Sequence, residues 1–370
     1  MFAIPRFYSQ KLFLPNFILS DAFKHRKCSL IKLAGIFIHH FSTSETEVQK
    51  YLKKHEKSVS FSLCSRVDNN ASATIQYLDS EQSGPLVLFI HGLMSEFQSF
   101  GDPFMSLSKK GVRVVAPNLP GYGKSWIKPA QSFNHSPDEI ASVLKSFLEC
   151  INISRVDMVL AHSVGMFSAV NLVAENPQSF RSMALICPAG LKREAWVYIK
   201  PYWLVKAGAY CLHNSLLRLM ALPFLRWGHR RAKADVSDSV IESDIHTIGN
   251  IDFQKASKYV DRIAGNKTPV LLAFGMRDPF IESYSFYDLV GHWGLTKEDL
   301  RFYNDKGILE NQESCITSSH HQDYRVALGF SRGSHSILHK YQDLLVEIML
   351  DMLNSVSKQD SVSNDRCYKQ

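Results

Sequence analysis

Short apolar runs alternate with longer amphipathic segments along most of the chain. The runs that predict β-strands are residues 59–67, 73–77, 85–90, 112–116, 156–160, 183–187, 270–274 and 324–330. The first two alternate apolar and polar positions and predict a ribbon with its turn at Asp68-Asn69-Asn70. The later runs are almost wholly apolar, which is typical of parallel strands buried on both faces. The pattern predicts an α/β fold, a mostly parallel eight-stranded sheet with helices on both faces.

The segments between the strands predict helices, at residues 98–110, 136–151, 164–173 and 337–353. Ser136-Pro137 offers the second of these an N-cap followed by proline at the first helical position. Residues 191–266 lack strand patterning and predict a helical cap inserted between the sixth and seventh strands. Residues 303–323 predict a polar surface loop, and residues 356–370 a polar tail.

Ser163 lies in the stretch around which the rest of the pattern is arranged, RVDMVLAHSVGMFSAV from Arg155 to Val170. A buried strand that turns directly into a helix through small-x-Ser-x-Gly is typical of a nucleophile elbow. The sharp turn would lift the serine hydroxyl clear of the sheet. Ala161 and Gly165 would be small because strand and helix pass close together. For this stretch alone, the alternative is an ordinary strand-to-helix turn that contains a serine.

Four other motifs follow predicted strands in a fixed order. They are His91-Gly92, Pro120-Gly121-Tyr122-Gly123-Lys124-Ser125, Gly275-Met276-Arg277-Asp278-Pro279 and Gly333-Ser334-His335. With the elbow, they make the chain resemble the α/β-hydrolase fold family, in its serine-nucleophile form, over roughly residues 58–355. One departure is Asn118, which stands where the family usually has an aspartate before the second motif. The resemblance does not reach a branch with an assigned substrate.

The resemblance implies a triad of Ser163, His335 and Asp278, in the order expected for this fold. A serine hydroxyl needs a base, which His335 would supply, while Asp278 would orient the imidazole. The backbone N–H groups of Leu93 and Val164 would form the oxyanion hole.

Other residues compete for two of these roles. Asp157 and Asp102 are alternative acids, although neither follows the carboxyl end of a predicted strand. His339 lies one helical turn beyond His335, which is preferred because it precedes the last helix. The alternative for Asp278 is a purely structural role as a turn residue.

The serine narrows the reaction that the resemblance implies. Relatives that open epoxides or displace halide carry a carboxylate at the elbow. Transfer of an acyl group from an ester, thioester or lipid-like bond to water is therefore expected, through an acyl-enzyme. A carbon–carbon bond hydrolase and a non-catalytic binding protein of the same fold remain alternatives.

The first half of the predicted cap interleaves aromatic residues with nine lysines and arginines against a single acid, Glu194. Met94, Trp196 and Trp203 are the predicted substrate-binding residues. The basic amphipathic pattern favours a lipid-like acyl substrate and peripheral contact with an anionic membrane. The alternative is an apolar stripe that only covers the core.

The net charge of +7 is concentrated in the cap and in residues 1–40. The remainder is mildly acidic, so a nucleic-acid partner is not expected. Seven scattered cysteines without a C-x-x-C pair predict neither a disulfide framework nor a metal site, and no cofactor is expected. No apolar run reaches the ~20 residues of a membrane span.

Residues 1–44 combine six basic residues with one acid, Asp21, and many apolar side chains. This composition is typical of a transit peptide, and we expect a mitochondrial location, with the cytoplasm as the alternative. A disordered arm, or one that contacts the cap, is the other interpretation.

Overall fold

The computed structural model describes residues 45–63, 71–130, 133–197, 202–230, 236–310 and 324–367. The chain divides into a short unit, Met1–Thr46, and a main unit, Glu47–Gln370, to which all elements below belong. The predicted transit peptide, the ribbon turn at 68–70 and most of the predicted loop at 303–323 lie outside the described residues.

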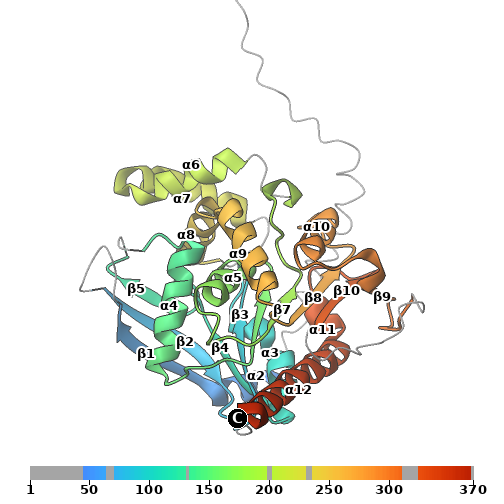
Figure 1. Cartoon of the computed structure of the whole chain (residues 1–370). Helices are drawn as coiled ribbons and strands as arrows, with labels where there is room; N and C mark the ends of the chain where they lie inside the picture. The colour runs from blue at the N-terminus through green and yellow to red at the C-terminus, as the bar shows by residue number, and fades with distance from the viewer. Residues whose placement is uncertain are drawn as a thin grey trace, which may run out of the picture. The chain divides into compact units, whose positions relative to one another are not determined.

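A ten-stranded sheet forms the centre of the main unit (Figure 1). Nine strands follow one another across it, in the order β1 (Glu56–Ser62), β2 (Ser72–Asp79), β4 (Arg113–Pro117), β3 (Leu86–Ile90), β6 (Met158–His162), β7 (Met183–Ile186), β8 (Val270–Gly275), β10 (Arg325–Phe330) and β9 (Leu300–Tyr303). The tenth, β5 (Trp126–Lys128), pairs with β2. The eight predicted strands are all present. The sequence predicted eight strands where the sheet has ten. The two missed strands, β5 and β9, are only three and four residues long and carry no clear apolar run.

From β4 across to β9, all neighbouring strands are parallel. On the opposite side of the sheet, the strands pair antiparallel. There β1 pairs with β2, and β2 with both β4 and β5. Neighbours β3, β6, β7, β8 and β10 all run parallel, so their carboxyl ends meet at one edge. In open α/β sheets, this edge is where functional loops gather.

Successive residues of β3 divide between two apolar cores, one on each face of the sheet. Leu88 and Ile90 belong to the core that is completed by α4 (Pro137–Cys150), α5 (Gly165–Glu175), α9 (Phe253–Gly265) and α10 (Tyr284–His292). Val87 and Phe89 belong to the core completed by α2 (Glu47–His55), α3 (Gly101–Lys109), α11 (Ile337–Lys340) and α12 (Gln342–Cys367). This alternation is the period-two pattern of a strand buried on both sides.

Three details of the helices differ from the expectations or refine them. Ser136 caps α4 as predicted, because its side chain accepts a hydrogen bond from the N–H of Glu139. The helix predicted from residue 98 begins as a 3₁₀ turn, η1 (Phe97–Phe100), before α3. The predicted polar tail is helical as far as Cys367, because α12 continues through it.

The cap lies between β7 and β8 and is smaller than the predicted segment 191–266. After the short turn η3 (Arg193–Ala195), α6 (Tyr202–His213), α7 (Ser215–Arg230) and α8 (Asp238–Gly249) pack on one another, above the sheet in Figure 1. Helix α9 belongs to the main fold instead, because it buries one side against α5 and the sheet. The turn η4 (Lys297–Asp299) precedes β9. Within the described residues, no helix is both long and apolar enough to cross a membrane.

Candidate active site

Ser163 occupies the turn between β6 and α5 in a backbone conformation that L-residues rarely adopt. Its φ is +54°, and its N–H donates a hydrogen bond of 3.1 Å to the carbonyl of Ile186 on the neighbouring strand. A left-handed, non-glycine residue costs about 1–3 kcal/mol and persists only where its surroundings enforce it. Gly165 shows the crowding around this turn, since a Cβ placed there would lie 2.5 Å from the carbonyl oxygen of His91.

Gly92 brings the loop after β3 directly against the serine. A Cβ at Gly92 would lie 2.9 Å from Ser163 Cβ and 3.5 Å from Ser163 Oγ. Leu93 follows on this loop, and Val164 begins the turn into α5. Within the described part of the chain, neither residue donates its backbone N–H to a hydrogen bond. Both predicted oxyanion donors therefore adjoin the serine with their N–H groups unpaired.

His335 and Asp278 are joined by a hydrogen bond, in which imidazole Nδ1–H donates to carboxylate Oδ2 at 2.5 Å. The Asp278 side chain has no exposed surface, and that of His335 is 16% exposed. The other carboxylate oxygen of Asp278 accepts the N–H groups of Phe280 and Ile281, at 2.8 and 3.1 Å. The aspartate is thus held from both sides, with one oxygen left for the histidine.

The two loops that carry this pair pack closely at the ends of β8 and β10. A Cβ at Gly275 would lie 2.3 Å from the carbonyl oxygen of Ser334, so the approach requires glycine. The N–H of Arg277 donates to the carbonyl of Gly333 at 2.8 Å. These contacts fix the spacing between the aspartate turn and the histidine loop.

His162 links the serine turn to the histidine loop. Its Nε2 lies 3.1 Å from the carbonyl oxygen of His335, so this nitrogen carries the proton and donates. The two rings are 4.7 Å apart. Burial, reinforced by neighbouring His335, lowers the pKa of His162 to about 3, and the ring is therefore neutral at ordinary pH. Within the described residues, Ser163 Oγ itself makes no hydrogen bond.

The competing residues lie elsewhere. His339 is on α11, where its Nδ1 is 3.6 Å from Asp102 at the surface. Asp157 accepts the N–H of Leu86 and pairs with Arg181, before the start of β6. Neither acid reaches His335.

Two motif residues have structural roles. Buried His91 donates Nδ1–H to the carbonyl of Gly92 and accepts the N–H of Leu119 at Nε2. Burial lowers the His91 pKa to about 4, which keeps the ring neutral and suits this pair of bonds. Asn118, the departure from the family pattern, accepts the N–H of Phe97 and donates to Gln76. Both side chains fix the loops beneath the serine.

Asp244 is a site residue that the sequence did not suggest. It is buried on α8, and its carboxylate accepts hydrogen bonds from the N–H of Met94 at 3.2 Å and from the Tyr122 hydroxyl at 2.5 Å. Its second oxygen lies 3.4 Å from Nε2 of His229 on α7. In the sequence, Asp244 stands out only as an acid on a mostly apolar face of a helix. Nothing local links it to Met94, because the two residues meet only in the folded chain.

The two predicted substrate-binding tryptophans lie in different surroundings. Trp196 is buried in the core, where its Nε1–H donates to the carbonyl of Ala189 and its ring packs against Phe167 and Phe253. Trp203 is 66% exposed on α6. One residue thus lies in the core and the other faces solvent, and their role in substrate binding stays a prediction. Met94, by contrast, adjoins the serine loop.

One group of side chains has the composition of a metal site. Donor atoms of His162, Cys187 and His335 lie within 4.8 Å of one another. Each already has a protein partner, since Cys187 Sγ approaches the carbonyl of Ser334 at 3.7 Å and both rings are hydrogen-bonded. The group is thus accounted for by the packing of the site.

Comparison with known proteins places the chain in a family. A family model described as the alpha/beta hydrolase fold matches residues 85–306. The chain is 34% identical over 105 residues to BODYGUARD 3 of Arabidopsis thaliana, named a probable lysophospholipase, covering 28% of this chain and 21% of that protein. It is 30% identical over 111 residues to a haloalkane dehalogenase of Psychrobacter cryohalolentis, covering 30% and 36%. These matches thus span at most about a third of either relative's own length.

A crystal structure of a candidate lipase from Acinetobacter baumannii superimposes with a TM-score of 0.57 at 17% identity, covering 86% of this chain and all of that one. At this identity, the likeness concerns the fold alone. Family model, sheet order and elbow agree, and the chain belongs to the α/β-hydrolase fold family.

Proposed function

We propose that the chain is a serine hydrolase that cleaves an ester, thioester or lipid-like acyl bond. One observation carries the proposal: His335 Nδ1–H donates to the buried carboxylate of Asp278 at 2.5 Å, beside the turn that holds Ser163 at positive φ. An oriented base next to a serine on a sharp strand-to-helix turn is the arrangement that nucleophilic acyl transfer requires.

In the first half-reaction, Ser163 Oγ attacks the substrate carbonyl carbon while its proton passes to Nε2 of His335. Asp278 stabilises the imidazolium through the Nδ1–H bond and keeps the ring in the productive tautomer. The carbonyl oxygen becomes an oxyanion, which the N–H groups of Leu93 and Val164 would stabilise. Return of the proton from Nε2 to the leaving group completes an acyl-enzyme.

In the second half-reaction, water attacks the acyl-enzyme as His335 takes its proton. A second oxyanion forms and collapses, and the proton returns to Ser163 Oγ as the carboxylic acid leaves. No metal or cofactor enters either step. The reaction needs an oriented base and two N–H donors for the oxyanion.

The elbow residue supports acyl transfer over the other chemistries of the relatives. One relative is a haloalkane dehalogenase, and the family resemblance implies a carboxylate nucleophile for that chemistry. This chain has Ser163 instead. The relative named a lysophospholipase makes a lysophospholipid ester a natural first substrate to test.

A fluorophosphonate probe tests the proposal directly. The full chain should be labelled, Ser163→Ala should lose all labelling, and Ser142→Ala on α4 should label like the wild type. All three should unfold at similar temperatures. Absence of labelling in the folded wild-type protein would favour the binding-protein alternative, and undiminished labelling of Ser163→Ala would exclude Ser163 as the nucleophile. Cleavage of a β-diketone without ester hydrolysis would favour the carbon–carbon alternative.

A further inference from the structure

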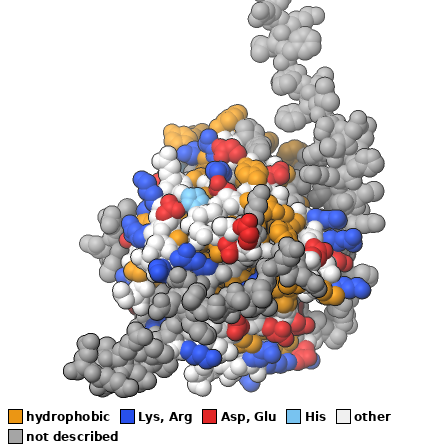
Figure 2. Space-filling view, turned by 45° about the vertical axis from the view of Figure 1, so that its right-hand side comes forward, with side chains coloured by type: hydrophobic (Ala, Val, Ile, Leu, Met, Phe, Trp, Pro, Cys, Tyr) orange, Lys and Arg blue, Asp and Glu red, His pale blue; other side chains and the backbone are white. Residues whose placement is uncertain are grey.

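The outer surface of helices α6 and α7, here called the hairpin face, is unusually apolar for a surface. Eight of the thirteen exposed large hydrophobic side chains among the described residues lie on these two helices. Figure 2 shows hydrophobic side chains at the top of the molecule, where α6 and α7 lie in Figure 1. Exposed apolar patches of this kind mark interaction sites.

The spacing shows that the exposed side chains form continuous stripes. On α7 they are Leu216, Leu219, Met220, Phe224 and Trp227, which recur every three or four residues on one side of the helix. On α6, Trp203 and Tyr210 are seven residues apart and therefore lie on one side. The opposite sides of the two helices meet α8 in a small core of Leu212, Leu222, Ile241 and Ile245. The hairpin is thus already packed on its inner side, and its outer stripe remains exposed.

The charges of the hairpin favour one kind of partner. Residues 202–230 contain Lys206, Arg218, Arg226 and Arg230 but no aspartate or glutamate. A hairpin that contributes basic side chains but no acidic one complements a phospholipid surface, with its acyl chains beneath anionic phosphates.

Two of the arginines are already neutralised. Arg218 donates to Glu242 at 2.9 Å, and Arg226 makes a two-pronged contact with Asp238, both acids being on α8. Both arginine side chains stay exposed, but each has a carboxylate partner. The anionic-membrane contact expected from the sequence therefore loses part of its electrostatic basis, and the apolar stripe takes the larger role.

We propose that the hairpin face is a docking surface for a phospholipid bilayer, into which the α7 stripe inserts at the level of the headgroups. Trp203, Tyr210 and Trp227 suit this depth, because their rings combine an apolar body with a polar atom. This proposal does not depend on the hydrolase assignment. Ser163→Ala should bind vesicles as the wild type does.

Flotation of the full chain with vesicles tests the proposal. We expect binding to phosphatidylcholine vesicles, a modest gain with phosphatidylserine, and little loss at high salt. The triple variant Leu219→Ser, Met220→Ser, Phe224→Ser should bind at least about tenfold more weakly. The matched control Trp126→Ser, Tyr284→Ser, Ile308→Ser removes three exposed hydrophobic residues outside the hairpin and should bind normally.

Tryptophan fluorescence provides a second readout. Vesicles should shift the emission of the wild type to shorter wavelength, and Trp227→Phe should lose part of that shift. Equal vesicle binding by the triple variant and the wild type would overturn the proposal, as would binding that disappears in high salt. A dimer that the triple variant dissociates, in a protein that ignores vesicles, would assign the face to self-association instead.

Discussion

The backbone N–H of Met94 donates a hydrogen bond of 3.2 Å to the buried carboxylate of Asp244. Met94 has a φ of +51° and follows Leu93, so this bond lets a cap helix hold the loop that would form half of the oxyanion hole. A non-glycine residue in this conformation needs such external support.

The first prediction concerns this bond. Asp244→Ala should slow fluorophosphonate labelling and lower kcat by about tenfold or more with little change in KM, because the Leu93 N–H loses its fixed direction. Asp244→Asn retains an acceptor oxygen and should keep most of the rate. Equal effects of both substitutions on kcat would contradict a positioning role. Melting temperatures would show whether Asp244→Ala also destabilises the cap, since it leaves the Tyr122 hydroxyl unpaired.

The second prediction separates the two histidines of the last loop and helix. His335→Ala should reduce kcat by several orders of magnitude, as removal of a triad member generally does. His339→Ala should change kcat less than about twofold, because its ring only approaches Asp102 at the surface. Steady-state hydrolysis of a short-chain ester measures both. The reverse order would mean that His335 is not the base.

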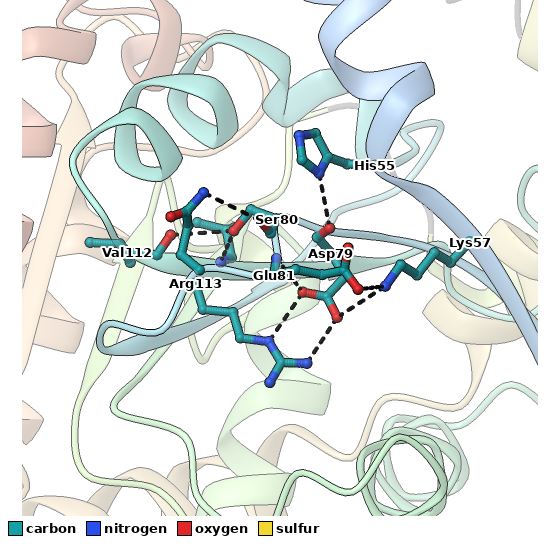
Figure 3. Close-up of polar contacts among 9 residues, drawn as sticks. His55, Lys57, Asp79, Ser80, Glu81, Val112 and Arg113 are labelled. Carbon is teal, nitrogen blue, oxygen red and sulfur yellow. Dashed lines mark hydrogen bonds and ion pairs between the residues drawn. The ribbon is translucent and has the colours of Figure 1, made fainter.

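The third prediction concerns the contribution of an ion pair between β2 and β4 to the stability of the fold. Asp79, at the end of β2, accepts two hydrogen bonds from Arg113 and one from the N–H of Glu81, with Lys57 3.9 Å away (Figure 3). Asp79→Ala should lower the free energy of unfolding by about 2 kcal/mol, because it leaves the guanidinium half-buried without its partner. Denaturant titration would measure the change. Glu47→Ala removes the exposed pair with Lys109 and should cost less than about 0.5 kcal/mol.

The pair of Asp79 with Arg113 should also make the free energy of unfolding depend on pH. Burial raises the pKa of Asp79, but the hydrogen bonds and charge of Arg113 outweigh it, and the net pKa is lowered. The unfolded state then binds the proton more readily. The contribution of the pair is complete above the unfolded pKa of about 3.9 and disappears as pH falls through the lower folded value. Asp79→Ala should therefore lose less stability on acidification than the wild type.

The fourth prediction uses His135, which is partly buried and stacks on His246 of cap helix α8. Burial, with a smaller effect of His246, lowers its pKa to about 3, so the folded state holds it neutral while the unfolded state protonates near pH 6.5. Stability is complete above pH 6.5 and should fall by about 1.4 kcal/mol per pH unit for this group as pH drops toward 4. His135→Asn, which tolerates the φ of +55°, should reduce the slope by that amount. An unchanged slope would show that the ring is accessible to protons in the folded state.

The sequence alone determined most of the fold, because that information is local. Buried parallel strands such as β3, β6 and β8 are short apolar runs, and their length and β-branched or aromatic residues distinguish them from helices. The elbow at Ser163 could also be predicted, since small residues are required wherever a strand and helix cross so closely. His335 and Asp278 were inferred from the motif order of the family that the chain resembles; a hydrogen bond joins them, and their catalytic roles stay a prediction.

Only the tertiary structure decided which side chains face which neighbours. Trp196 and Trp203 have similar sequence surroundings, yet one is in the core and the other in solvent, because the direction of a cap helix depends on contacts far away in the chain. Arg218 and Arg226 count as free charges in the sequence, whereas α8 supplies their partners only after the cap has packed. Asp244 reaches Met94 across 150 residues, and no local pattern could have joined them. Local propensity selects helices and strands, but burial, pairing and alignment arise only when distant segments exclude water together.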